Sequence, residues 1–148
     1  VLGGHGDTMV PMPNHTTVDG KSLTELIKEK KISQERLESI IERTRKGGAE
    51  IVKLLEKGSA FYAPAVSGVE MAESFIRDSK KVLPCAAFLK GEYGVKNLYL
   101  GVPVVIGKSG VEKIIEIKLS EEEKNNLKKS INSVNELYNA AKKIDNSF

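Results

Sequence analysis

His5 stands in a run of glycines near the start of the chain. Gly3 and Gly4 precede it, and Gly6 and Asp7 follow it. Little side-chain bulk surrounds the histidine, and glycine permits backbone conformations that other residues avoid. Imidazole changes its charge near neutral pH, which suits a group that accepts a proton in one direction of a reaction and returns it in the other. The local sequence therefore makes His5 a candidate for proton transfer, with an ordinary turn histidine as the alternative.

Metal binding and dinucleotide binding are weaker interpretations of the same segment. His5, Asp7 and His15 are acceptable zinc donors, but two histidines and one carboxylate at this spacing are a weak pattern, and we expect no metal site. The glycines on either side of His5 supply the first two positions of a dinucleotide fingerprint, yet Met9 occupies the third. No strand-helix-strand unit surrounds them, so the pyrophosphate-binding loop of a dinucleotide is not expected here.

Two other motifs favour structural interpretations. The Gly107-Lys108-Ser109 segment resembles the end of a phosphate-binding loop, but Val102 stands where that motif needs glycine, so we predict a hairpin turn. The single cysteine, Cys85, lies in an apolar stretch that favours a buried, neutral thiol. One cysteine cannot form an intrachain disulfide, which fits a reducing cytoplasm.

The composition is that of a soluble globular domain. The chain has 148 residues, 40% hydrophobic and 29% charged, with 23 basic and 20 acidic side chains interspersed. This mixture predicts no polyanion-binding face, and the Phe and Tyr residues lie mostly in apolar segments, so nucleic-acid binding is not expected. No apolar run is long enough to span a membrane. The chain shows no signal-peptide pattern, and because it opens on valine rather than methionine, we expect a piece of a longer protein.

Periodicity predicts the elements that must position these residues. Residues 1–18 are typical of short strands and turns, and helices are predicted over residues 22–30, from Ser33 to near Gly58, and from Pro64 to about Lys80. The pair Gly47-Gly48 inside the long helix predicts either a kink or the close approach of another backbone. The apolar stripes of these helices are expected to face a core.

The second half of the chain predicts a sheet closed by a helix. Strands are expected over residues 82–89, 98–106 and 115–119, followed by a helix that Ser120 and Glu123 begin with a capping box. Along the chain, short strands and helices come first, three consecutive strands follow, and a last helix ends the chain. This order, without alternating strand-helix units, indicates an α+β fold with an antiparallel sheet.

Four blocks of the sequence resemble the lactate/malate dehydrogenase family. Residues 1–11 contain the Gly-x-His-Gly-Asp segment in which that family carries its catalytic histidine. Residues 43–52, 58–65 and 101–107 are similar to successive blocks of its bacterial, malate-oxidising members. Since the resemblance spans essentially the whole chain, it implies that residues 1–148 are the C-terminal, substrate-side domain of such an enzyme, with the fold of that domain.

The resemblance implies reversible, NAD-dependent oxidation of malate to oxaloacetate, a step of the tricarboxylic acid cycle. His5 would take the hydroxyl proton of malate and return it in the reverse direction. Ala60 falls at the family position that faces the variable side of the substrate, and Pro64 near the wall beside the nicotinamide. NAD would be bound mainly outside this chain.

Several parts of the family's machinery precede the histidine and are absent from this chain. They are the carboxylate that orients the histidine, the arginine that binds the substrate carboxylate, the arginine of a mobile loop, and the NAD-binding domain. We therefore expect the chain to need an N-terminal NAD-binding Rossmann domain as its partner and to have negligible activity alone. As family members are oligomers, a cytoplasmic homo-oligomer is expected.

Two alternatives remain open at this level. The substrate could be lactate or another 2-hydroxy acid, because the residue that reads its far end lies mostly in the missing loop. The chain could also be an oligomerisation module without activity, because the long helix over residues 33–57 could form a subunit interface.

Overall fold

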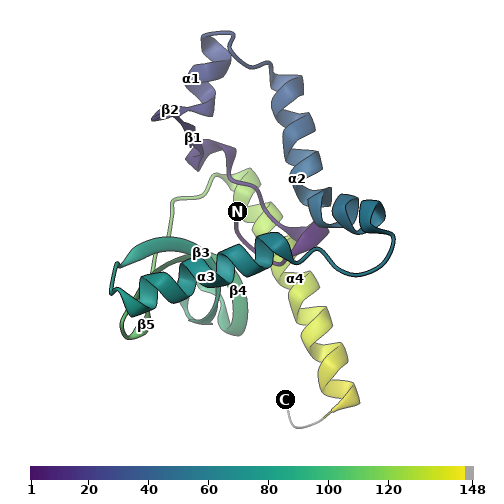
Figure 1. Ribbon diagram of the computed structural model, residues 1–148, viewed down its shortest axis with the longest axis vertical. Coiled ribbons are helices and arrows are strands. Elements are labelled where there is room, and N and C mark those ends of the chain that lie inside the picture. Colours follow the sequence, from purple (N-terminus) through teal and green to yellow (C-terminus); the bar gives the residue numbers. More distant parts are fainter. Residues whose placement is uncertain (146–148) are drawn as a thin grey trace. The chain divides into compact units, whose positions relative to one another are not determined.

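The structure is a computed structural model, and it describes residues 1–145. It divides into two compact units. One contains Val1–Val10 together with the chain from Ala60 onward, and the other contains Pro11–Ser59. Figure 1 shows the order of the elements along the chain.

The unit formed by Pro11–Ser59 is mainly helical. Its elements are the 3-10 turn η2 (Pro13–His15), the two-residue strands β1 (Thr17–Val18) and β2 (Lys21–Ser22), and the helices α1 (Leu23–Lys28) and α2 (Gln34–Leu55). Ser22 begins α1 with a complete capping box that includes Glu25, and the Ser33 hydroxyl accepts a hydrogen bond from Arg36 N–H at the start of α2. Both predicted helices are confirmed.

Helix α2 runs through the glycine pair without interruption. A Cβ added to Gly47 or Gly48 would meet no atom within 4 Å among the described residues, so the close approach of another backbone is not found. Figure 1 shows the ribbon of α2 changing direction in its second half, which agrees with the predicted kink.

The second unit is built on an antiparallel sheet, as predicted. Its elements are the 3-10 turn η1 (Gly6–Thr8), helix α3 (Tyr62–Ile76), strand β3 (Lys81–Lys90), turn η3 (Glu92–Gly94), strands β4 (Lys96–Gly107) and β5 (Gly110–Ile114), and helix α4 (Glu121–Ile144). The strand order is β3-β4-β5, and α3 and α4 both contact the central strand β4. Alternate residues of β4 form the core: Leu98, Leu100, Val102, Val104 and Ile106 are each at most 5% exposed.

The last strand lies earlier in the sequence than predicted. The prediction of a strand over residues 115–119 is wrong, because β5 ends at Ile114 and the pair Gly107–Gly110 closes a tight hairpin turn. The Tyr93 hydroxyl donates to the carbonyl of Ile115 (2.7 Å) and accepts from the N–H of Ile117 (3.1 Å). A half-buried phenol thus satisfies backbone groups that a strand would have paired with its neighbour.

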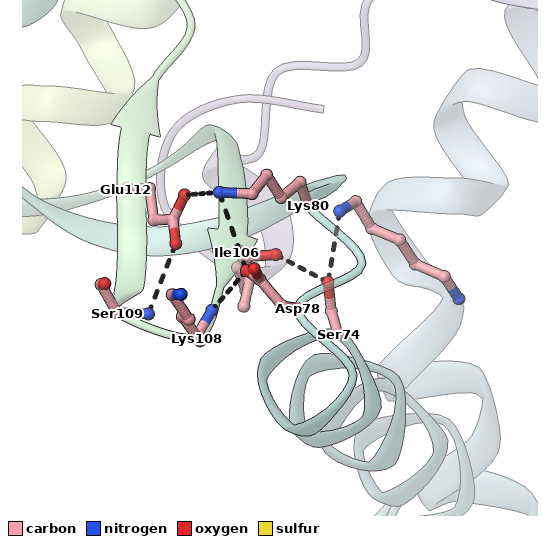
Figure 2. A network of polar contacts seen from close by, with 8 residues as sticks. Ser74, Asp78, Lys80, Ile106, Lys108, Ser109 and Glu112 are labelled. Carbon is pink, nitrogen blue, oxygen red and sulfur yellow. Dashed lines mark hydrogen bonds and ion pairs between the residues drawn. The ribbon is translucent and has the colours of Figure 1, made fainter.

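Ser74 attaches the C-terminal end of α3 to the sheet. Its side chain is fully buried, donates to the Ile106 carbonyl (2.8 Å) and accepts from the Lys81 N–H (3.2 Å), as Figure 2 shows. One hydroxyl therefore connects a helix, the strand that follows it and the central strand.

A network of charged groups surrounds this attachment at the β4-β5 turn (Figure 2). The backbone N–H of Lys108 donates to Asp78 (2.9 Å) and holds the pKa of that carboxyl below its usual value. Lys80 donates to Glu112 (2.8 Å), which lowers the pKa of Glu112 and raises that of Lys80. Because these charged groups are solvated, their ion pairs contribute little to stability. The buried hydrogen bonds of Ser74 therefore contribute more to holding α3 on the sheet.

Replacing Ser74 with alanine is expected to lower the free energy of unfolding by about 1 to 3 kcal/mol, because it leaves a buried carbonyl and N–H unpaired. Chemical denaturation of the full-length protein would measure the change. Ser67→Ala is the matched control on the exposed side of the same helix, with an expected change within about 0.5 kcal/mol. Equal effects of the two substitutions would show that Ser74 does not attach α3.

The expectation that every helical stripe faces a core is wrong for α3 and also for α2, where Ile40, Ile51, Val52 and Leu55 are 41–44% exposed. Val66, Val69 and Ile76 are 67%, 64% and 78% exposed, and Phe61 and Tyr62 at the start of the helix are also exposed. The described chain supplies no layer that covers these side chains, so their burial needs another part of the protein or another chain. Within residues 1–145, no helix is long and apolar enough to cross a membrane.

Candidate active site around His5

A pair of backbone hydrogen bonds closes the segment that carries His5. The N–H of Leu2 donates to the carbonyl of Val10 (2.9 Å), and the N–H of Val10 donates to that of Leu2 (2.8 Å). Both side chains are 2% exposed, so they fix the base of the segment in the core. Residues 3–9 between them form what we call the His5 loop.

A second pair of hydrogen bonds ties the His5 loop to the sheet. The N–H of Gly3 donates to the carbonyl of Gly101 on β4 (2.8 Å), and the N–H of Gly101 donates back to Gly3 (3.0 Å). A Cβ on Gly101 would lie 2.5 Å from the Gly3 carbonyl oxygen. Glycine at position 101 thus lets the two backbones approach each other.

The third attachment comes from helix α4. The N–H of Gly4 donates to the hydroxyl of Ser130 (2.8 Å), a side chain that is 1% exposed. Gly3 has φ +89°, and a Cβ there would collide with that same hydroxyl. Position 3 therefore requires glycine both for its backbone conformation and for space.

His5 follows directly after these attachments and is itself exposed. It lines a pocket of about 440 Å³ together with Met9, Cys85 and Tyr99. Among residues 1–145, no side chain forms a hydrogen bond with the imidazole. The arrangement presents an imidazole from a firmly attached backbone, with both ring nitrogens available for a substrate or for a group outside this chain.

Cys85 lies in the wall of the pocket but is not a second reactive group. Its side chain is 8% exposed, and burial raises the pKa of the thiol. A neutral thiol is a weak nucleophile, so the predicted structural role of Cys85 is confirmed in its burial and its environment.

Ala60 and Pro64 do not line the pocket of His5. Ala60 is half-buried just before α3, and Pro64 is exposed in the first turn of that helix. Near Pro64, the rings of Phe61 and Tyr62 stack with their centroids 4.6 Å apart, and both are exposed. This end of α3 thus presents an exposed apolar surface, and the roles of Ala60 and Pro64 stay predictions.

The sequence patterns missed Ser130, Cys85 and Tyr99 as neighbours of the His5 loop. Ser130 is 126 residues from Gly4 along the chain. In the sequence, Ser130 is recognisable only as a polar residue beside the apolar stripe of α4. This position does not predict a hydrogen bond to Gly4. For metal binding, no group of three or more His, Cys, Asp or Glu side chains suited to an ion is found in the described part of the chain.

Comparison with known proteins identifies the family to which this site belongs. The family profile described as lactate/malate dehydrogenase, alpha/beta C-terminal domain, matches residues 1–146. The chain belongs to the lactate/malate dehydrogenase family. In curated proteins, it is 66% identical to the malate dehydrogenase of Pelagibacter ubique and 57% identical to that of Caulobacter vibrioides, over 98% and 99% of this chain.

Solved structures of lactate/malate dehydrogenases have the same fold. A malate dehydrogenase from Cryptosporidium parvum superposes with a TM-score of 0.94 at 46% identity, over 96% of this chain and 45% of that one. A lactate dehydrogenase from Eimeria maxima, solved with NADH and oxamate, superposes with a TM-score of 0.93 at 42% identity, over 97% of this chain and 45% of that one. The predicted α+β fold and the predicted family are confirmed.

The chain accounts for less than half of these relatives. It covers 45% of the Pelagibacter ubique protein and 46% of the Caulobacter vibrioides protein. The matches therefore establish the domain and its family.

Proposed function

We propose that this chain is the substrate-side part of an NAD-dependent malate dehydrogenase and that His5 accepts and returns the proton of the reaction. The observation that carries the proposal is the exposed imidazole of His5, presented by a loop whose backbone is attached at Gly3 and Gly4. The family match and the 66% identity to a malate dehydrogenase support it.

His5 acts as a general base in one direction and as a general acid in the other. During malate oxidation, neutral imidazole takes the proton of the C2 hydroxyl as the C2 hydrogen leaves as hydride. NAD, when bound, supplies the acceptor for that hydride. In the reverse direction, the imidazolium hydrogen-bonds to the carbonyl oxygen of oxaloacetate, polarises it and gives the proton back.

Ala60 and Pro64 are proposed to shape the site around the reacting atoms. Ala60 has a small side chain and would leave room on the variable side of the substrate. Pro64, beside the exposed rings of Phe61 and Tyr62, would form part of an apolar wall against the nicotinamide. An apolar wall excludes water from the path of the hydride, which strengthens the electrostatic interactions in the site.

The proposed protein needs its other half. Residues 1–148 would form the C-terminal domain, and a preceding domain would bind NAD and supply the carboxylate and arginines absent here. The imidazole of His5 has no hydrogen-bonding side chain within residues 1–145, which agrees with an orienting group from outside the chain. The exposed apolar side chains of α3 support assembly into a homo-oligomer, and we place the protein in the cytoplasm and in the tricarboxylic acid cycle.

The isolated chain is expected to turn over malate and NAD at less than about one-hundredth of the rate of the full-length protein, because it lacks the groups that orient the substrate. The formation of NADH by both proteins at equal molar concentration would measure the ratio. A rate for the isolated chain close to the full-length rate would contradict the expected division of the site between two domains.

Lactate is the second candidate substrate. The Eimeria maxima lactate dehydrogenase superposes almost as well as the malate dehydrogenase from Cryptosporidium parvum, so the fold does not separate the two activities. Comparing kcat/KM for malate and for lactate in the full-length protein tests the proposal. A larger kcat/KM for lactate than for malate would show that lactate is the substrate. It would not change the proposed role of His5.

A further inference from the structure

The hydroxyl of Ser130 is the one side-chain group on helix α4 that hydrogen-bonds the backbone of the His5 loop in the described chain. It accepts the Gly4 N–H at 2.8 Å, one peptide before His5. The side chain is 1% exposed, so the bond is shielded from competing water. A bond of this kind restricts the peptide that leads directly into the imidazole.

The other attachments of the loop do not fix that peptide. The bonds between Leu2 and Val10 close the base of the loop, and those between Gly3 and Gly101 lie one residue further from the histidine. Beyond His5, the hydrogen bond found for η1 among residues 1–145 stays within the loop, from Met9 N–H to the Gly6 carbonyl (3.0 Å). The last fixed point before the imidazole is therefore the Gly4 peptide, and Ser130 is what fixes it.

The surroundings leave room for one small hydroxyl-bearing side chain at position 130. A Cβ on Gly3 would collide with the Ser130 hydroxyl, and one on Gly4 would lie 3.6 Å from it. The two glycines and the serine thus fit together as one contact between α4 and the loop. Without a hydroxyl at position 130, the Gly4 N–H would be left unpaired.

We propose that Ser130 is a positioning residue for His5: it fixes the Gly4 peptide so that the imidazole meets the substrate in the geometry needed for proton transfer. This inference rests on the proposed role of His5. Misplacing a reacting group by about 1 Å costs on the order of 100-fold in rate, so a hydrogen bond at the neighbouring peptide has a large effect on turnover.

The experiment compares Ser130→Ala, Ser130→Thr and Ser133→Ala with the parent in the full-length protein. Ser133 is the matched control, because it lies three residues further along α4 and its hydroxyl bonds only the Lys129 carbonyl of its own helix (3.3 Å). Steady-state kcat and the KM values for malate and NAD are measured well below the melting temperature of each variant. Threonine keeps the hydroxyl that alanine removes.

We expect Ser130→Ala to lower kcat and kcat/KM for malate by the same factor, about 10-fold or more, with both KM values within twofold of the parent. Ser130→Thr should recover part of the loss, and Ser133→Ala should match the parent. A lower melting temperature with unchanged kcat would show that Ser130 is a structural contact only and would overturn the inference. A threonine variant that folds but recovers nothing would also contradict it.

Failure of the proposed function is visible separately, in the parent. If the parent oxidises lactate and not malate, kcat and kcat/KM of each variant are compared with those of the parent for lactate. This comparison tests the role of Ser130 equally well. If the parent oxidises no 2-hydroxy acid, the proposed function fails first, and the positioning role of Ser130 fails with it.

Discussion

Replacing His5 with glutamine is expected to lower kcat for malate oxidation by about 100- to 10,000-fold in the full-length protein, the range that general acid-base catalysis contributes. Glutamine keeps a polar side chain of similar reach, but its amide does not take up and release a proton near neutral pH. Steady-state rates of NADH formation would measure the loss, and fluorescence titration would show NAD binding unchanged.

The second histidine of the chain supplies the control. His15 lies in η2 of the other compact unit, and His15→Gln should leave kcat within about twofold of the parent. A full loss of NAD binding in His5→Gln would point to a damaged cofactor site instead of a missing proton acceptor. A kcat near the parental value would remove His5 from the chemistry.

Replacing Gly3 with alanine is expected to lower the free energy of unfolding by about 2 to 5 kcal/mol. Of this, about 1 to 2 kcal/mol comes from a non-glycine residue at positive φ, and about 1 to 3 kcal/mol from overpacking against Ser130. The backbone of Gly3 has φ +89° and is bonded to Gly101, so it cannot relax without breaking the attachment to the sheet. Chemical denaturation would measure the change.

Gly6→Ala separates the two contributions to this loss. Gly6 has φ +80°, close to that of Gly3, but a Cβ there meets nothing within 4 Å in the described structure. We expect only the cost of the backbone conformation, about 1 to 2 kcal/mol. If both variants lose the same stability, the close contact between Gly3 and Ser130 does not constrain the loop.

Local signals predicted most of the elements because their causes are local. Ser22, Ser33 and Ser120 begin helices by accepting N–H groups within three residues of themselves. The third strand was misplaced because the alternation of Ile115 and Ile117 resembles a strand, whereas the chain there is bonded by the hydroxyl of Tyr93. No local pattern shows a partner more than 20 residues away.

The apolar stripe of α3 also shows that a local sequence pattern does not identify a distant partner. Its pattern predicts burial, but a pattern does not say which part of a protein covers it. Val66 and Val69 remain exposed here because the described chain supplies no covering layer. The start of the long helix α2 at Ser33 was predicted correctly. The sequence did not decide whether the glycine pair inside it causes a kink or allows another backbone to approach, and the structure shows the change of direction.

The sequence by itself determined that His5 is the candidate for proton transfer, because residue type and flanking glycines are local properties, and the blocks along the chain indicated the family. Only the tertiary structure decided how that histidine is held. The bonds from Gly101 and Ser130 to the His5 loop join residues 98 and 126 positions apart along the chain. Such pairs form because the sheet and α4 pack together, and packing between distant segments leaves no pattern in the sequence of either one.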